Sequence, residues 1–314
     1  IVEIGGTVGD IESLPFLEAI RQMHYEFGAE NVFCIHLTLV PYIAAAKELK
    51  TKPTQHSVKE LRSIGIQPNV LVCRADRQIP KEQMKKIATF CNVKESHVFE
   101  AKDLSSIYLL PLVLHNQNFD QAIVDDLNIW TRKPELSEWL TIEKRLKSPS
   151  RSCRVGIIGK YTDVLDSYKS LQEALIHAGI ANDAKVQVCY FDATQVSSQN
   201  AEEKLKGLDG IVVPGGFGER GASGKVAAIR FARLNNVPFL GICLGMQLAV
   251  VEFASDVLAL AEATSAEFDE NVCEPVIHLM EEQKELSEMG GTMRLGLYPC
   301  VLKKESKAYK AYNR

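Results

Sequence analysis

The stretch VPFLGICLGMQLAVVEFA, residues 237–254, decides the fold, because an apolar run turns through Gly-Ile-Cys-Leu-Gly into a longer helical run. The first part predicts a buried β-strand and the second a helix. Gly241 and Gly245 flank Cys243 where the chain must turn sharply, and they relieve the crowding of such a turn. A thiol there faces outward at a helix N-terminus, which favours the thiolate. The stretch predicts an α/β fold with Cys243 as a nucleophile; a buried strand cysteine is the alternative.

The same alternation of short apolar runs and longer amphipathic runs extends along the chain. It is typical of βα units and a mainly parallel sheet. Helices are predicted for LPFLEAIRQMHYEFG and TQHSVKELRSIG, whose apolar residues have helical spacing and which end in glycine. Strands are predicted at residues 1–5, 31–40, 69–74, 154–159, 185–191, 210–216 and 237–243.

The pattern breaks after Leu127. Residues 130–152 are charged, contain both tryptophans and end in a Lys-Ser-Pro-Ser-Arg-Ser cluster, which indicates a linker with an amphipathic helix. We therefore expect two domains, residues 1–129 and 153–314, joined by this linker. The predicted fold class is α/β, with two doubly wound, mainly parallel-sheet domains.

Composition excludes several classes of function. The 36 basic and 40 acidic residues give a net charge of −4, which lacks the basic excess of a nucleic-acid or anionic-membrane binder. No apolar run reaches the roughly 18–20 residues of a membrane span, and IVEIGGTVGD is not a signal peptide. The eight cysteines form no CxxC pair, so we expect a reducing cytoplasm and mostly inert core thiols.

A glycine-rich segment, VVPGGFGERG at 212–221, ends the strand before the Cys243 stretch. Such a loop can direct backbone N–H groups at a developing oxyanion with no Cβ in the way. Together with the turn at Cys243, it predicts an oxyanion hole formed by the N–H groups of Gly216 and Leu244.

VPGGFG followed by GICLGMQ resembles the class I glutamine amidotransferase domain, in which a cysteine attacks the side-chain amide of glutamine and releases ammonia. The resemblance implies that Cys243 is the nucleophile and that Gln247 and Glu267 hold the glutamine. A carboxylate at Glu267 can pair with the α-ammonium of glutamine, and a solvated loop acid is the alternative.

The family takes its catalytic base from a His-Glu pair late in the domain. After Cys243 the only histidine is His278, in EPVIHLM, which reads as a core or edge residue of a strand. We therefore expect this 314-residue chain by itself not to hydrolyse glutamine efficiently.

In the first domain, IVEIGGTVGDIES at 1–13 places Glu3 in a predicted strand, glycines in the turn after it, and Asp10 and Glu12 at the start of a helix. Glycine-rich turns at carboxyl ends of strands expose N–H groups to phosphates, and carboxylates there suit Mg²⁺. Alternatively, Asp10 and Glu12 simply stabilise the helix N-terminus. The segment 47–56, KELKTKPTQH, adds lysines that could bind a polyphosphate, or it is a solvated loop.

GGTVGDIES and KTKPTQHSV closely resemble the synthetase, or amidoligase, domain of the CTP synthase family. The resemblance continues through FCNV (90–93), DLSSIY (103–108) and VGIIGKYTD (155–163) and covers essentially the whole chain. It implies a P-loop, dethiobiotin-synthetase-like first domain and a flavodoxin-like second domain. In this family ATP phosphorylates O4 of UTP, and ammonia from glutamine displaces that phosphate to give CTP.

Carried over residue by residue, the resemblance implies that Glu3 is a Mg²⁺ ligand and that Leu104 contacts ATP. It also implies feedback inhibition by CTP, activation by GTP, and homodimers to homotetramers that stack into filaments in the cytoplasm. The implied site for UTP and CTP comprises Asp10, Ile11, Glu12, Lys50, Thr51, Lys52, Pro53, Thr54, Gln55 and Lys86.

No Gly-x-x-x-x-Gly-Lys-Ser/Thr occurs in these residues, although the family has a P-loop. We therefore expect the chain to be the middle of a longer enzyme, and to be inactive by itself. Two other hypotheses remain at this point. One is a different bipartite amidoligase of the cobyric acid synthase type, and the other is an assembly or regulatory module without catalysis, with LPFLEAIRQM as a subunit contact.

Overall fold

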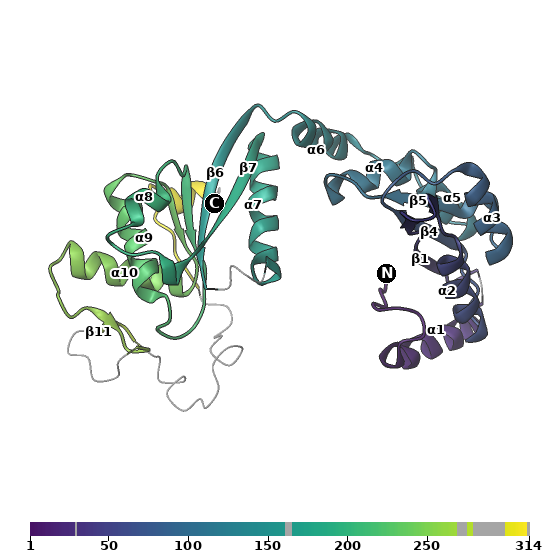
Figure 1. Cartoon of the computed structure of the whole chain (residues 1–314), viewed down its shortest axis with the longest axis horizontal. Coiled ribbons are helices and arrows are strands. Elements are labelled where there is room, and N and C mark those ends of the chain that lie inside the picture. The colour runs from purple at the N-terminus through teal and green to yellow at the C-terminus, as the bar shows by residue number, and fades with distance from the viewer. Residues whose placement is uncertain (29, 161–164, 269–274, 279–298, 313–314) are drawn as a thin grey trace. The chain divides into compact units, whose positions relative to one another are not determined.

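The computed structural model describes residues 1–28, 30–160, 165–268, 275–278 and 299–312. The chain divides into two compact units, Ile1–Ser148 and Pro149–Arg314. Each unit has its own parallel sheet with helices on both faces, as the sequence predicts (Figure 1). No helix among the described ranges is long and apolar enough to cross a membrane.

The sheet of the first unit has the order β1-β4-β5, with all neighbours parallel. β4 is central, and its alternate residues are buried on opposite faces, as expected of a strand covered on both sides. A short antiparallel hairpin, β2–β3, follows β1. The strands are β1 (Ile35–Leu39), β2 (Tyr42–Ile43), β3 (Glu48–Leu49), β4 (Val70–Ala75) and β5 (Val98–Lys102).

The helices of this unit divide between the two faces of the sheet. Leu71 and Cys73 of β4 pack with α2 and α3, whereas Val70 and Val72 pack with α4 and α5. The predicted helices at 14–28 and 54–65 are confirmed, and α6 lies in the segment predicted as linker. The helices are α1 (Leu14–Phe27), α2 (Lys52–Ser63), α3 (Lys81–Cys91), α4 (Leu110–His115), α5 (Phe119–Asp126) and α6 (Ser137–Lys147).

The strand predicted at residues 1–5 is wrong. The segment forms no ladder with β1, and Ile1 and Val2 lie exposed. β-branched residues favour a strand only where a neighbouring strand pairs with them and a packed surface buries them, and in the described residues β1 pairs only with β4. Residues Ile4–Val8 instead line a cavity of about 430 Å³ together with α1 and Ile35.

The second unit contains a four-stranded parallel sheet in the order β7-β6-β8-β9, which confirms the four strands predicted there. A short parallel pair, β10–β11, lies after α10 in the sequence. The strands are β6 (Arg151–Gly159), β7 (Ala184–Asp192), β8 (Gly210–Val213), β9 (Phe239–Gly241), β10 (Thr264–Ser265) and β11 (Pro275–Ile277).

α7 covers one face of this sheet, and α8, α9 and α10 cover the other (Figure 1). Ile157 and Val212 pack toward α7, while Ile158, Ile211 and Val213 pack toward the other helices. The helices are α7 (Lys169–Ala181), α8 (Ala201–Leu205), α9 (Ala222–Leu234), α10 (Leu244–Asp256) and α11 (Lys307–Tyr312).

Candidate active site

Cys243 occupies the turn between β9 and α10, where it is exposed. Its backbone has φ 52° and ψ −114°, a combination that residues with a side chain rarely adopt. α10 begins at the next residue, so the thiol stands at the N-terminal end of a 13-residue helix, where an anion is favoured. The predicted sharp strand-to-helix turn is confirmed.

Two glycines make this turn possible. A Cβ on Gly245 would lie 2.0 Å from the carbonyl oxygen of Val213, and one on Gly241 would lie 2.6 Å from the backbone of Gly245. Both distances are shorter than any side chain tolerates, and the atoms involved are backbone. Glycine is therefore required at both positions because α10 approaches β8 and β9 so closely.

The glycine-rich loop after β8 lies beside the thiol. A Cβ on Gly215 would lie 3.2 Å from Cβ of Cys243, and one on Gly216 would lie 3.9 Å from Cδ2 of Leu244. Leu244 is the first residue of α10, so its N–H has no preceding helical carbonyl to bond. The structure thus brings Gly216 and Leu244 to Cys243, and their role as oxyanion donors stays a prediction.

The ammonium groups of two buried lysines, Lys160 and Lys225, donate hydrogen bonds to backbone carbonyl oxygens of this loop. The Lys160 ammonium donates to the carbonyl oxygens of Phe217 at 2.7 Å and Gly218 at 2.9 Å, and the Lys225 ammonium donates to that of Pro214 at 3.0 Å. Burial lowers the pKa of Lys160, and burial together with the nearby Lys160 charge lowers the pKa of Lys225 to about 8.

Sequence reasoning missed both lysines, because a lysine usually reads as a surface residue. For Lys225 a signal exists in the helical spacing of α9. Ala222, Lys225, Ile229 and Ala232 fall on one face, and all four are buried.

Glu267 follows β10 and reaches the same loop. Its Oε1 accepts a hydrogen bond of 2.8 Å from the Gly218 N–H. Gln247 lies half-buried one turn into α10, where its N–H donates to the Cys243 carbonyl oxygen at 3.1 Å. The structure therefore places Gly216, Leu244 and Gln247 close to Cys243 and joins Glu267 to the same loop through Gly218, and their binding of glutamine stays a prediction.

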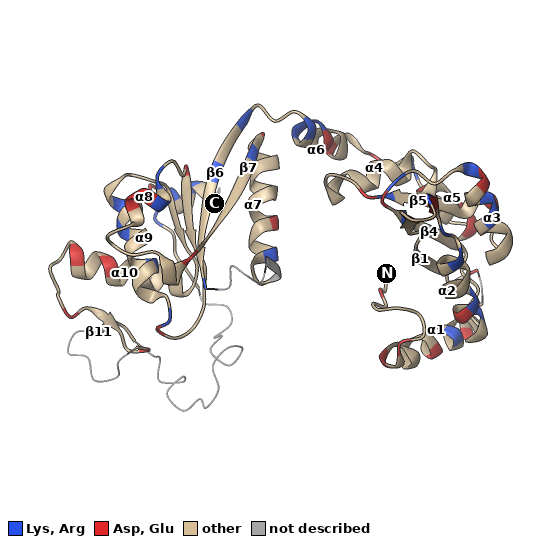
Figure 2. Cartoon of the chain, viewed as in Figure 1, with Lys and Arg blue, Asp and Glu red and all other residues tan. Residues whose placement is uncertain are grey.

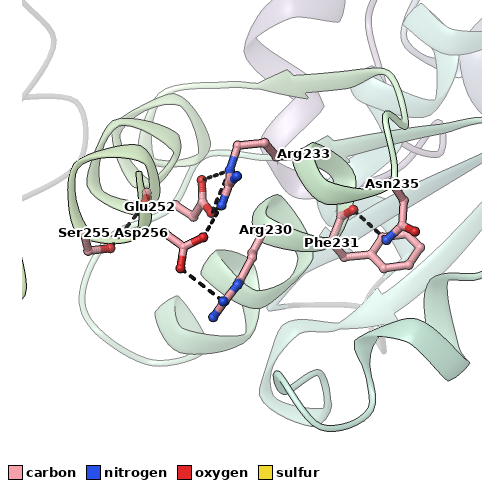
Figure 3. A network of polar contacts seen from close by, with 7 residues as sticks. All are labelled: Arg230, Phe231, Arg233, Asn235, Glu252, Ser255 and Asp256. Atoms are coloured by element: carbon pink, nitrogen blue, oxygen red, sulfur yellow. Dashed lines mark hydrogen bonds and ion pairs between the residues drawn. The ribbon is translucent and has the colours of Figure 1, made fainter. Parts of the chain in front are cut away.

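A network of ion pairs fixes α10 against α9 (Figure 3). Arg233 donates to both carboxylate oxygens of Glu252, with a shortest distance of 2.7 Å, and also contacts Asp256. Arg230 pairs with the other oxygen of Asp256 at 3.2 Å. Because the Glu252 side chain is only 2% exposed, this contact connects the helix of Cys243 firmly to the helix of Lys225.

The other thiols differ from Cys243 in their surroundings. Burial raises the pKa of Cys73 and of Cys91 to about 11, so both stay protonated at neutral pH. Cys300 is exposed like Cys243, whereas Cys273 lies outside the described residues. His278 is exposed just after β11, which pairs with the short strand β10, so of the two expected readings the core position is wrong and the strand-edge position fits.

In the first unit, the predicted cations gather beyond the carboxyl end of β1. Lys50 forms an ion pair with Glu48 of the β2–β3 hairpin, and the hydrogen bond and charge of Lys50, with a weaker contribution from the charge of Lys86 of α3, lower the pKa of Glu48. Arg77, which sequence reasoning missed, lies 3.3 Å from the centre of the Tyr42 ring on the same hairpin. Lys52 is exposed at the start of α2.

The residues between these cations have structural contacts. Thr54 is fully buried, and its hydroxyl donates to Thr38 at 3.2 Å and to the Leu39 carbonyl oxygen at 3.3 Å. Thr51 is buried too and accepts a hydrogen bond of 3.0 Å from Gln55. The Thr54 contacts attach the start of α2 to β1, and Pro53 lies exposed in the first turn of α2.

Asp10, Ile11 and Glu12 lie in the glycine turn and the 3₁₀ helix that follows it, a different segment from that of these cations. The Asp10 carboxylate accepts a hydrogen bond of 2.7 Å from the Thr7 N–H, and so shapes the glycine turn before the 3₁₀ helix Ile11–Ser13. Ile11 and Glu12 lie exposed. Over the described ranges, no hydrogen bond or ion pair joins these three residues to the segment 50–55.

Glu3 and Leu104 lie in different segments of the first unit. Glu3 is exposed in the N-terminal segment, and no group of three or more acidic, histidine or cysteine side chains that could hold a metal ion occurs among the described residues. Glu3 therefore fits Mg²⁺ only as one carboxylate beside ligands that a bound phosphate would supply. Leu104 is half-buried after β5, next to the Arg74–Asp103 ion pair of 2.8 Å.

Residues 1–129 match the family model for the CTP synthase N-terminus, and residues 163–314 match that for class-I glutamine amidotransferases. CTP synthases from Trichlorobacter lovleyi and Geotalea uraniireducens are 55% identical to the chain over 314 and 313 residues, or 100% and 99% of it. The chain spans 59% of the length of each.

One solved structure, the glutaminase domain of Trypanosoma brucei CTPS with bound acivicin, is 38% identical over 41% of this chain and 50% of that one, with a TM-score of 0.39. The two family models follow each other along the sequence in the order of the two units, and the curated relatives match across both. The chain belongs to the CTP synthase family.

Proposed function

We propose that these residues serve a CTP synthase, which uses ATP to aminate UTP to CTP with ammonia taken from glutamine. The observation that carries the proposal is the exposed thiol of Cys243 at a strained strand-to-helix turn, beside the Gly215–Gly216 loop. The CTP synthases of which this chain spans 59% support the complete reaction.

In the glutamine half-reaction, the Cys243 thiolate attacks the side-chain amide carbon of glutamine. The carbonyl π electrons move onto the oxygen, and the N–H groups of Gly216 and Leu244 stabilise the oxyanion. When the C–N bond breaks, the nitrogen takes a proton and leaves as ammonia, while a glutamyl thioester remains on Cys243. Water then attacks the thioester, which releases glutamate and restores the thiol.

Gln247 and Glu267 hold the glutamine main chain during this reaction. One oxygen of Glu267 accepts from the Gly218 N–H, so the carboxylate is oriented by the same loop that carries Gly216. Its negative charge attracts the α-ammonium of glutamine. Gln247, one helical turn from Cys243, is within the same small region and can donate to the substrate carboxylate or accept from its ammonium.

In the second half-reaction a phosphoryl group passes from ATP to O4 of UTP, and ammonia then displaces it as inorganic phosphate. Lys50, Lys52 and Lys86 lie on the hairpin, α2 and α3 beyond the carboxyl end of β1, where they can neutralise a triphosphate. Mg²⁺ would neutralise phosphate charge, with Glu3 as a protein ligand and Leu104 contacting the ATP.

The family also supports the biological setting of the proposal. We place the activity in the cytoplasm, in pyrimidine nucleotide synthesis, with CTP as feedback inhibitor and GTP as activator. Homodimers and homotetramers, able to stack into filaments, are the proposed assemblies. Neither nucleic acid nor membrane is a proposed partner, since the net charge is −4.

Covalent capture by a glutamine analogue tests the proposal. 6-Diazo-5-oxo-L-norleucine carries an electrophilic carbon where glutamine has its amide, so it should label Cys243 and not the equally exposed Cys300, as read by peptide mass spectrometry. Glutamine should protect Cys243, and Cys243→Ser should abolish labelling. Equal labelling of Cys243 and Cys300, or no protection by glutamine, would contradict the proposal.

A further inference from the structure

Lys225 is the most thoroughly buried charged side chain of the second unit, with 0% of its surface exposed. Its ammonium has three donors, and the Pro214 carbonyl oxygen, at 3.0 Å, is the acceptor that the described residues provide. Within those residues it forms no ion pair with a carboxylate. Burying an ammonium group without a carboxylate partner costs stability, which indicates that its charge acts on a group nearby.

The charge lies on the far side of the loop that flanks the thiol. A Cβ on Gly216 would lie 3.7 Å from the Lys225 Nζ, and a Cβ on the preceding Gly215 would lie 3.7 Å from the Cys243 Sγ. Two consecutive residues without side chains therefore lie close to these groups, Gly216 to the ammonium and Gly215 to the sulfur. Because Lys225 is fully buried, the attraction between its charge and a charge on the sulfur is less screened than it would be in water.

Other charged groups near this loop are Arg220, which donates to the Lys160 carbonyl oxygen at 3.5 Å, and residues of two further elements. Lys160, at the end of β6, bonds the Phe217 and Gly218 carbonyl oxygens, and Glu267, after β10, accepts from the Gly218 N–H. The opposite charges of Lys160 and Glu267 attract each other, as the rise that Glu267 causes in the pKa of Lys160 indicates. Within α9, Lys225 is therefore the cation beside this loop that has no carboxylate partner, and the charge of the Cys243 thiolate offsets part of the fall that burial and Lys160 cause in the pKa of Lys225.

We propose that Lys225 is a positioning residue that fixes the Gly215–Gly216 loop through Pro214 and, as an ammonium, favours the thiolate of Cys243. This proposal rests on the proposed glutamine half-reaction for its purpose. The effect of Lys225 on the thiol is expected whatever reaction Cys243 performs. A purely structural role would fix the loop and leave the ionisation of the thiol unchanged.

The test is the pH profile of Cys243 alkylation by iodoacetamide in the 314-residue chain, read peptide by peptide. Lys225→Met keeps the length and removes the charge, so the profile should move to higher pH and the rate at pH 7 should fall roughly 3- to 10-fold. Lys225→Arg should restore most of the rate. Cys300, exposed and alkylated in the same sample, is the internal control.

Lys204→Met is the matched control, because Lys204 also donates to a backbone carbonyl oxygen, that of Gln195, at 2.6 Å but on the exposed surface. It should leave the Cys243 profile unchanged. The inference is wrong if Lys225→Met lowers the melting temperature and leaves the Cys243 profile at its original pH.

A second measurement does not depend on the folding of Lys225→Met. In chains with ¹³C-labelled lysine, the NMR titration of Lys225 should have a lower midpoint in Cys243→Ser than in the unchanged chain, because the thiolate no longer favours the ammonium. Identical midpoints overturn the inference. Neither measurement uses glutamine, so a failure of the proposed function, seen as unprotected labelling by the diazoketone, is distinguishable from a failure of this inference.

Discussion

At the scale of single residues, the site depends on positions where a side chain is forbidden as much as on those where one is needed. Cys243 holds a strained backbone because Gly241 and Gly245 let α10 lie against β8 and β9. The energy of that strain must come from packing elsewhere in the unit. The buried side chains between the sheet and α8–α10 supply it.

Gly245→Ala should destabilise the second unit strongly. The new Cβ would meet the Val213 carbonyl oxygen at 2.0 Å, and neither backbone can move without displacing β8, so we expect a loss of about 2–3 kcal/mol in the free energy of unfolding. Urea denaturation measures it. Gly210→Ala, where the nearest atom is 3.7 Å away, is the control and should cost less. Equal losses in the two variants would contradict the close approach.

Lys225 should make stability depend on pH in an identifiable window. Its pKa falls from the ordinary 10.5 to about 8 in the folded chain, so between these values the unfolded chain binds the extra proton. Stability therefore rises with pH across this window, relative to a chain without the group. The free energy of unfolding of the unchanged chain minus that of Lys225→Met, measured from pH 7 to pH 10, should increase. If this difference in the free energy of unfolding does not change with pH, the Lys225 ammonium is exposed to water in the folded chain.

At the scale of elements, two contacts position the site: the α9–α10 ion pairs and the hairpin after β1. Arg233 connects the helix that begins at Cys243 to the helix that carries Lys225. In the first unit, the β2–β3 hairpin holds Glu48 and Lys50 over the carboxyl end of β1. The ion pairs join two helices, and the hairpin fixes a short loop.

Arg233→Met should lower the melting temperature of the second unit by roughly 5–10 °C, because it leaves the Glu252 carboxylate buried without a partner. Arg230→Met is the control. Its side chain is half-exposed and pairs only with Asp256, so the change should be within about 2 °C. Differential scanning calorimetry measures both. Similar shifts for the two variants would show that the burial of Glu252 has no importance.

Lys50→Gln and Lys86→Gln should each weaken UTP binding about tenfold in isothermal titration calorimetry, and high salt should reduce the difference. The positive charges of both lysines act on the Glu48 carboxylate of the hairpin, so both lie near it. Lys59→Gln, at an exposed position of α2, is the matched control and should bind UTP like the unchanged chain. If all three variants bind equally, the cations of the hairpin are not the triphosphate site.

The sequence predicts the regular elements well and the polar contacts poorly. The runs at 69–74 and 154–159 are confirmed as strands because their apolar residues are buried on both faces. Residues 1–5 are similarly rich in β-branched residues but pair with no strand in the described part of the chain, which composition alone does not reveal. Lys160 and Lys225 escaped prediction because their burial depends on Phe217, Gly218 and Pro214, which lie in another segment of the chain.

At the scale of the whole molecule, charge is dispersed rather than gathered. Figure 2 shows cationic and acidic residues mixed along α1 and α3, and the chain carries 36 basic and 40 acidic residues. An anion is therefore attracted only where a few lysines face it together, as at the hairpin. The molecule as a whole repels extended polyanions.

We accordingly expect the chain to pass through a heparin column without retention at about 0.15 M salt. The change Glu48→Lys should not alter this result, because replacing one acidic residue by one basic residue still leaves the net charge negative. Elution above about 0.3 M salt would reveal a basic surface that the mixed charges of the helices do not suggest.

The close approach of α10 to β8 also has a meaning for inhibitors. Since a Cβ on Gly245 would lie 2.0 Å from the carbonyl oxygen of Val213, the first turn of α10 beside Cys243 cannot shift toward β8 when a bulkier electrophile binds the sulfur. The Pro214–Gly218 loop is held by Lys160 and Lys225, so extra atoms have to project toward solvent, where Phe217 is exposed. Chemists who enlarge the reactive group would therefore meet a fixed backbone, and those who extend the groups that face solvent would meet fewer constraints.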